Sequence, residues 1–249
     1  MDRVASQLTL FDKRAGAAPF SVRESPRARR LTVRVYPGGR VEVTVPAGTR
    51  PDVVAGFVAR HRDWIDRKVA VFANRPDPAR QPLPERISLQ ATGREWQVTY
   101  LPGSRTRVQP RGGGELEVRC DAARQADTRR ALRDWLVEEA RGTLEPWLAE
   151  VAQHCGLTYE RIQLRRQRTR WGSCSRSGTI SLNVSLLFQP PEVVRYLLVH
   201  ELCHTRHMNH SPRYWRLVAE HEPDYERLDR ALTRGWQHVP GWVYAEEQP

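Results

Sequence analysis

Two short segments near the start of the chain alternate apolar with polar residues, which is the period of a strand that buries one face. They cover residues 31–35 and 41–45, and turn-forming residues at 37–39 separate them. The pattern predicts a β-hairpin. Residues 1–20 show no sustained period, and we expect them to form a flexible tail.

The apolar spacing changes to three and four residues between positions 54 and 72, as on one face of a helix. Thr49 precedes this stretch as a possible cap, and Pro51 suits the first turn. We therefore predict one amphipathic helix packed on the hairpin. A Pro-rich connector at 74–84 follows, and then come four short strand patterns, at 87–90, 96–101, 105–109 and 116–119.

The second half of the chain begins with a helical pattern from Asp127 to about His154. Pro146 predicts a kink or break within it, and Gly156 ends it. Strands are predicted at 161–167 and 179–183 and helices at 191–207 and from 211 onward. The fold class is therefore α+β, with a β-rich region at 21–119 followed by a compact domain at 120–249.

Composition restricts the class of protein. No apolar run approaches the roughly 20 residues that cross a bilayer, and the first residues lack a secretory signal pattern. The four cysteines form no CxxC pair, so we expect reduced thiols and a cytoplasmic protein. The net charge of +11 favours contact with polyanions such as nucleic acid or nucleotides.

The strongest chemical signal is a His-Glu-x-x-His motif that starts at His200. His200 and His204 are four residues apart, so a helix projects both imidazoles from one face and can place them on one zinc ion. Glu201 is rotated away from that face and can take a proton from a zinc-bound water. The motif predicts two metal ligands and a general base.

A hydrolytic zinc site needs a third protein ligand and one open position. His210 is the leading candidate because the chain can curl back under the metal six residues after His204. Glu220 or Glu222 on the following helix is the alternative, and a cysteine ligand, Cys174 or Cys203, is a weaker one. The metzincin glycine and Met-turn are absent, which excludes that class.

The chain resembles the YgjP-like metallopeptidase family, which is related to the WLM and SprT-like zinc proteases. The resemblance covers about residues 20–240 and rests on the segments Arg170-Trp171-Gly172-Ser173-Cys174, Gly178-Thr179-Ile180-Ser181-Leu182-Asn183, Val199-His200-Glu201-Leu202-Cys203-His204, Asn209-His210-Ser211-Pro212 and Tyr214-Trp215. It implies a zincin-like domain with one Zn²⁺ per chain on His200, His204 and His210, and Glu201 as general base. Tyr214 stands where family members more often have phenylalanine.

The substrate is expected to be a polypeptide. The strand at 179–183 is a candidate sheet edge along which an extended peptide adds, with its carbonyl on zinc. The substrate-binding candidates are Arg170, Trp171, Gly172, Ser173 and Asn183. The alternative is that residues 171–174 form a structural turn, with Gly172 for backbone geometry and Trp171 for packing.

Two other functions remain open. Four arginines at 165, 166, 168 and 170 offer bidentate phosphate contacts, so a nucleoside triphosphate pyrophosphatase is one alternative; this activity has been associated with the family. The other is a basic nucleic-acid-binding protein with a structural zinc. The three histidines and the glutamate favour the enzyme, because structural zinc usually has four closed protein ligands.

The N-terminal segment contains a candidate linear motif. Gln7, Leu8, Leu10 and Phe11 match the QLxLF peptide with which bacterial proteins dock onto the DNA sliding clamp. A mobile tail ahead of a folded region suits such a motif. The alternatives are an edge strand that uses Leu8 and Leu10, or a chance match.

Overall fold

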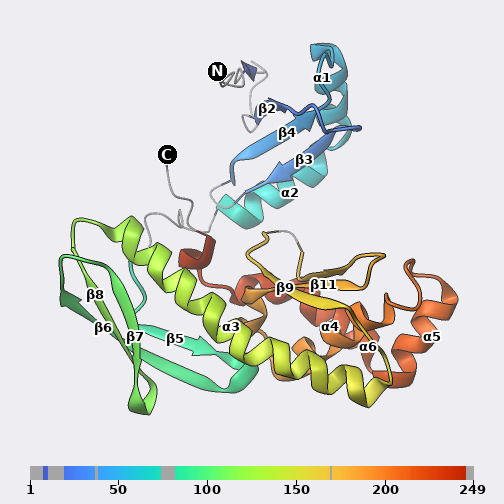
Figure 1. Cartoon of the computed structure of the whole chain (residues 1–249). Helices are drawn as coiled ribbons and strands as arrows, with labels where there is room; N and C mark the ends of the chain where they lie inside the picture. The colour runs from blue at the N-terminus through green and yellow to red at the C-terminus, as the bar shows by residue number, and fades with distance from the viewer. Residues whose placement is uncertain (1–7, 11–19, 37–38, 74–81, 169, 245–249) are drawn as a thin grey trace. The chain divides into compact units, whose positions relative to one another are not determined.

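The computed structural model describes residues 8–10, 20–36, 39–73, 82–168 and 170–244. The chain divides into two compact units, Met1–Gln81 and Pro82–Pro249, and each is described by itself (Figure 1). No helix among the described residues combines the length and the apolar character that crossing a membrane requires.

The first unit is built on a four-stranded sheet with the order β1-β2-β4-β3. The predicted hairpin is confirmed, because β3 (Thr32–Val35) and β4 (Val41–Val45) pair antiparallel. β2 (Phe20–Glu24) lies parallel to β4 and was not expected from the sequence. β1 (Leu8–Leu10) pairs with β2, so these three residues form an edge strand rather than part of a tail.

Two helices replace the single helix predicted for this unit. α1 (Pro51–Arg60) and α2 (Arg62–Ala73) are separated by His61, whose backbone N–H donates to the carbonyls of Phe57 and Val58. Thr49 does not cap α1: Arg50 is the N-cap residue, and the Thr49 hydroxyl donates to the Pro46 carbonyl at 2.7 Å. The buried core of the unit consists of Val41, Val43, Val45, Val54, Val58 and Ile65.

The four strands predicted at the start of the second unit are confirmed. β5 (Arg86–Leu89), β6 (Arg94–Pro102), β7 (Arg107–Arg111) and β8 (Glu115–Cys120) form a sheet with the order β5-β6-β8-β7, in which β6 and β8 are parallel. The turn between β7 and β8 depends on glycine, because a Cβ on Gly114 would lie 2.7 Å from the Glu95 carbonyl oxygen.

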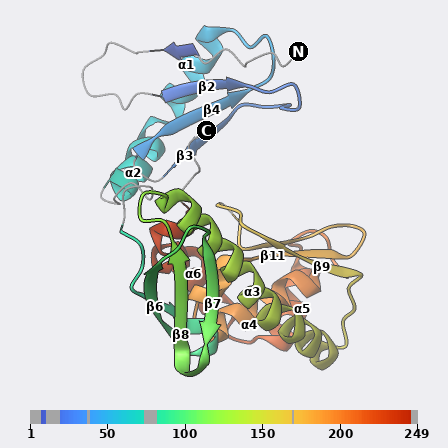
Figure 2. The same ribbon diagram turned by 60° about the vertical axis from the view of Figure 1, so that its left-hand side comes forward.

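The long helix α3 (Gln125–Cys155) continues through Pro146, so of the predicted kink or break the break does not occur. Gly156 ends the helix as expected, in a left-handed conformation with φ of 61°. In the views of Figures 1 and 2, α3 lies between the green sheet and the orange helices.

The sheet of β5–β8 shares one hydrophobic core with α3 and with the helices that follow. Leu116 and Val118 of β8 are fully buried in this core together with Leu132 and Leu136 of α3. The rings of Trp96 and Trp135 meet edge to face across it, with centroids 5.5 Å apart. The compact unit therefore begins at residue 82 and not at residue 120, where the sequence placed the boundary.

A second sheet of this unit has the order β10-β11-β9. β9 (Arg161–Arg165) and β11 (Thr179–Asn183) are parallel, and β10 (Gly172–Cys174) pairs antiparallel with β11. The expectation that 179–183 forms a sheet edge is therefore wrong, because β11 is the central strand. β10 is an edge strand, and it contacts the helix that carries the metal motif.

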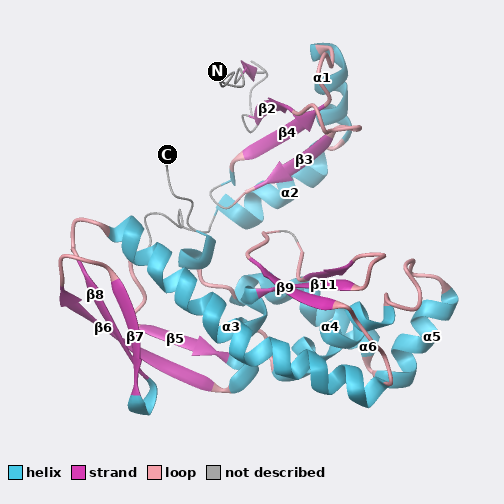
Figure 3. Cartoon of the chain, in the orientation of Figure 1, coloured by secondary structure: helices cyan, strands magenta, loops and turns pink. Residues whose placement is uncertain are grey.

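The helices α4 (Pro191–Cys203), α5 (Pro212–His221) and α6 (Tyr225–Arg234) complete the described part of the unit and are drawn in cyan in Figure 3. α4 is buried on almost all sides, which explains the apolar residues around its motif. It ends at Cys203, four residues before the predicted end. Short 3₁₀ segments lie at Gln90–Thr92, Gly112–Gly114, Val184–Phe188, Gly235–His238 and Gly241–Tyr244.

Candidate metal centre

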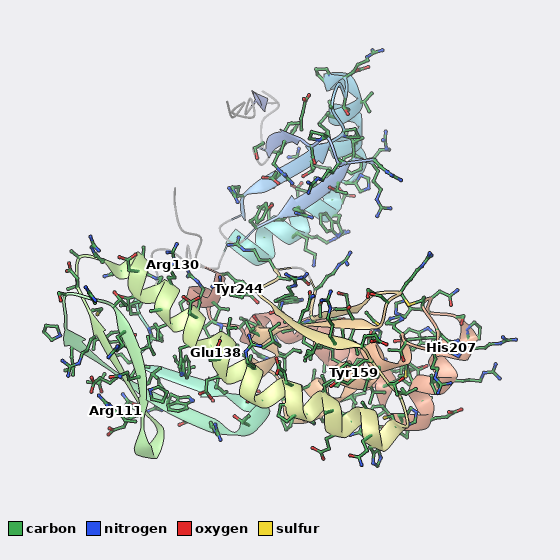
Figure 4. The ribbon with its side chains drawn as sticks, viewed as in Figure 1. Arg111, Arg130, Glu138, Tyr159, His207 and Tyr244 are labelled. Atoms are coloured by element: carbon green, nitrogen blue, oxygen red, sulfur yellow. The ribbon has the colours of Figure 1, made fainter. Side chains whose placement is uncertain are left out.

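The end of α4 and the segment after it bring three histidines together. His200 lies in the last turn of α4, His204 is its C-cap residue, and His210 precedes α5. One ring nitrogen from each histidine lies within 4.8 Å of the other two. Figure 4 labels His207, which lies in the same segment between α4 and α5.

The separation of the ring nitrogens fits a single metal ion. The Nε2 atoms of His200 and His210 are 3.3 Å apart. Two imidazoles on one tetrahedral zinc, with Zn–N bonds of about 2.0–2.1 Å, place their nitrogens about 3.3 Å apart. The chemistry of the donor set also fits, because imidazole is a common ligand of zinc.

Hydrogen bonds on the far side of two rings set the tautomer that metal binding needs. Nδ1 of His204 lies 3.1 Å from the backbone carbonyl oxygen of His207. A carbonyl only accepts hydrogen bonds, so Nδ1 of His204 must carry the proton, which leaves a lone pair on Nε2. Nδ1 of His200 lies 3.3 Å from the hydroxyl of Tyr196.

Two aromatic residues of α5 hold the histidines from one side. The Tyr214 ring stacks on His204 with centroids 4.5 Å apart, and its hydroxyl donates to the His200 carbonyl at 3.1 Å. The Trp215 ring stacks on His210 with centroids 5.4 Å apart. These contacts fix the rings before a metal binds, and the Ser211 side chain, which accepts from the Tyr214 N–H, starts α5 directly after His210.

Burial keeps the paired histidines neutral. It lowers the pKa of His200 to about 3, and the neighbouring His204 and His210 act in the same direction. Burial also lowers the pKa of His204, against a smaller opposite effect of the His207 carbonyl. Neutral imidazoles have the lone pair that a cation needs.

Glu201 points its carboxylate into a buried space. The residue is 4% exposed, and its Oε2 atom has no hydrogen-bond partner among the described residues. Burial raises its pKa to about 8, while the charge of Arg170 acts in the opposite direction. An orphaned buried carboxylate oxygen is costly in a merely structural position, so its place next to the histidines indicates a chemical role.

Gly172 supplies the space for that carboxylate. A Cβ at position 172 would lie 2.5 Å from Oε1 of Glu201 and 2.9 Å from both Cγ and Cδ. Contacts below 3.0 Å essentially never occur for a real Cβ. The glycine of β10 is therefore required by the side chain of Glu201, and not by an unusual backbone angle.

A comparison with models of protein families decides to which family the chain belongs. The model described as the YgjP-like metallopeptidase domain matches residues 29–235. The chain belongs to the YgjP-like family. This membership supports a hydrolase of the zinc-protease type that binds a divalent metal, and the three histidines offer the site for it.

Two further comparisons add less. The crystal structure of the metallopeptidase zymogen abylysin from Pyrococcus abyssi is 27% identical, covers 36% of this chain and 92% of that chain, and aligns with a TM-score of 0.33. No curated protein matches the sequence.

The other candidate ligands of this YgjP-like chain lie outside the histidine cluster. Glu222 forms an ion pair with Arg195 at 2.6 Å, and Glu220 is exposed on α5. Cys174 and Cys203 are free thiols, and burial raises the pKa of both, to about 11 and about 12. His210 is thus the third histidine that the structure brings to the site.

The five candidate substrate-binding residues occupy different environments. Asn183 is buried; its amide donates to the carbonyls of Gln167 and Arg170 and accepts from the Ser185 N–H. Trp171 is buried and stacks on Trp236 with centroids 3.9 Å apart. The contacts of Trp171 fit the packing role that the structural alternative gave it, although residues 172–174 form the strand β10 rather than a turn. The ones nearer to solvent are Arg170, Gly172 and Ser173.

The four-arginine cluster is largely engaged elsewhere. Arg165 donates to Gln163, Arg166 pairs with Asp134 at 3.7 Å, and Arg168 donates to the Tyr244 carbonyl. Arg170 is the member of the cluster whose charge acts on Glu201.

Two residues of the site were missed by sequence reasoning. Tyr196 lies one turn before His200, so its helical spacing was a usable signal. Asp229 accepts a hydrogen bond from Tyr196 but comes from α6, and no spacing rule connects it to the motif.

Proposed function

We propose that this protein is a zinc metallopeptidase whose metal is held by His200, His204 and His210. The observation that carries the proposal is the orphaned carboxylate of Glu201 beside three histidines whose nitrogens converge. A zinc ion bound there supplies a Lewis acid for the peptide carbonyl and lowers the pKa of water at its open position.

Glu201 is the general base of this proposal. Its Oε2 has no hydrogen-bond partner among the described residues, and the charge of a zinc ion held nearby would lower the raised pKa of this carboxyl, which favours the ionised form that a base needs. The carboxylate takes a proton from the attacking water and can return it to the leaving amine. Gly172 and the helix α4 fix its position from two sides.

The edge strand β10 is the proposed platform for the peptide. Trp171 and Ser175 exchange backbone hydrogen bonds with β11, through Asn183 N–H to Trp171 O and Ser175 N–H to Thr179 O. Hydrogen-bonding positions alternate along an antiparallel strand, so Gly172 and Cys174 turn their N–H and C=O groups away from β11. No other described strand pairs with that side, and an extended peptide can add there beside Glu201.

Glu201→Gln tests the proposal because it keeps the shape of the side chain and removes its basicity. We expect the variant to lose at least about 100-fold in hydrolysis of an unfolded protein substrate, the range for a lost general base. Its zinc content, measured by elemental mass spectrometry, should equal that of the wild type. Retained hydrolysis by the variant, or no peptide hydrolysis by the zinc-loaded wild type, contradicts the proposal.

The alternative of a nucleoside triphosphate pyrophosphatase has less support. It requires several arginines to converge on the phosphates, whereas three of the four have other partners. Hydrolysis of nucleoside triphosphates by the zinc-loaded wild type, measured beside its hydrolysis of peptides, compares the two functions directly.

Nucleic acid is the partner that the charge distribution supports. Residues 1–81 contain 16 Lys and Arg against 8 Asp and Glu, so they carry +8 of the net charge of +11. In the first unit the sheet face opposite the core carries polar residues, and its Glu42 is held by Arg23 at 3.2 Å and by the Tyr36 hydroxyl. Three arginines of the β2–β3 loop are exposed and have no ion pair among the described residues: Arg27, Arg29 and Arg30. Arginines bind phosphates well.

A further inference from the structure

A hydrogen-bonded chain connects helix α6 to the first histidine of the motif. The hydroxyl of Tyr196 donates to Oδ1 of Asp229 at 2.8 Å. The same hydroxyl lies 3.3 Å from Nδ1 of His200. Tyr196 is one helical turn before His200 on α4, and Asp229 is in the middle of α6.

The direction of these hydrogen bonds determines the tautomer of His200. A phenol has one proton, and Tyr196 gives it to the carboxylate of Asp229. The phenol oxygen can then only accept from His200, so Nδ1 of His200 carries a proton and Nε2 has the lone pair. That Nε2 atom is the one that faces Nε2 of His210.

The tyrosine in this series of hydrogen bonds lies in the protein core. Tyr196 is fully buried, and the pKa of its hydroxyl is raised by burial and by the hydrogen bond to Asp229. A buried phenol without a partner is costly, so Asp229 stabilises the tyrosine in the orientation that meets His200. His204 is oriented differently, by the carbonyl of His207.

We propose that Tyr196 and Asp229 are positioning residues that hold His200 in the tautomer and orientation needed for metal binding. The inference rests on the metal site of the proposed function. It adds that α6, which contributes no ligand, controls metal affinity through Tyr196. Partners of this kind typically change metal affinity by about 10- to 100-fold when they are removed.

The test measures zinc dissociation constants by competition with a chromophoric chelator, without any hydrolysis assay. The variants of the full chain are Tyr196→Phe, Asp229→Asn and the double variant, with Asp224→Asn as control. Asp224 precedes α6 and its exposed carboxylate pairs with Arg227 at 3.5 Å, so its replacement removes the same charge without touching the histidines. Thermal unfolding of the metal-free proteins reports on folding.

We expect each single variant to weaken zinc binding by about 10- to 100-fold, and the control by less than about twofold. The double variant should bind zinc as the Tyr196→Phe variant does, because Asp229 acts through the hydroxyl. Single variants that bind zinc as tightly as the wild type overturn the inference, and so do fully additive effects. If the single variants lose zinc affinity but the wild type hydrolyses no peptide, the inference stands and the proposed function fails.

Discussion

Replacement of Gly172 by alanine tests whether the base and the strand share one tightly filled space. The added Cβ would lie 2.5 Å from Oε1 of Glu201, and ordinary contact begins at 3.4 Å. The carboxylate must therefore move by about 0.9 Å, or β10 must retreat by that amount. A misplacement of about 1 Å in a catalytic group can cost about 100-fold in rate.

We expect Gly172→Ala to lower peptide hydrolysis by about 100-fold while the zinc content stays the same, because no histidine is touched. Forced packing of one methyl group should cost about 1–3 kcal/mol of stability. The matched control is Gly142→Ala in α3, where an added Cβ meets nothing within 4 Å.

The control should gain up to about 1 kcal/mol of stability, because alanine favours a helix more than glycine does. Hydrolysis of an unfolded protein, zinc content and thermal unfolding are measured for both variants. A Gly172→Ala enzyme with activity within threefold of the wild type would refute the spatial argument.

The remaining predictions concern the third metal ligand, the positively charged first unit and the N-terminal segment. His210→Ala should lose most bound zinc in elemental mass spectrometry, whereas Glu222→Gln should keep it; the opposite result makes the glutamate the ligand. Reversal of the loop arginines at 27, 29 and 30 to glutamate should weaken binding to duplex DNA at least tenfold in fluorescence anisotropy at low salt, and the wild-type affinity should fall as salt rises. The matched control replaces three exposed arginines of the second unit, Arg86, Arg105 and Arg107, by glutamate, and it should change DNA binding far less. A peptide of residues 1–16 should bind sliding clamp, and no binding at tens of micromolar would end that hypothesis.

The tail prediction extends beyond the described residues. Residues 1–7 and 11–19, which include Gln7 and Phe11 of the clamp motif, lie outside them. Leu8–Leu10 pair with β2, which matches the edge-strand alternative for these residues. Titration of the peptide measures binding to the sliding clamp separately from the pairing of Leu8–Leu10 with β2.

Local patterns predicted most of the strands and the metal motif. Apolar and polar residues alternate clearly in the hairpin and in the strands β5, β6, β7 and β8. The two histidines and the glutamate depend on spacing within one helix, which a sequence displays directly. His210 was predicted because a return of the chain after α4 brings it under the motif.

Long-range pairing explains what the sequence did not reveal. β11 is central because β9 pairs with it in parallel and β10 pairs antiparallel, and no local pattern distinguishes a central strand from an edge. α3 passes through Pro146 because the flanking residues Leu144 and Leu148 are both fully buried, so tertiary packing outweighs a local preference. Asp229 belongs to the site only through the packing of α6 on α4.

The close approach of Gly172 to Glu201 means that one strand, β10, affects the positions of both the peptide and the base. In the proposed mechanism, the outer side of β10 determines how far along its length a peptide lies, and its inner side limits where the base sits. Both positions therefore depend on the backbone atoms of β10. Because Glu201 belongs to α4, a shift of β10 relative to that helix would change the distance between the peptide and the base, so the close approach at Gly172 ties catalysis to the packing of the sheet on α4.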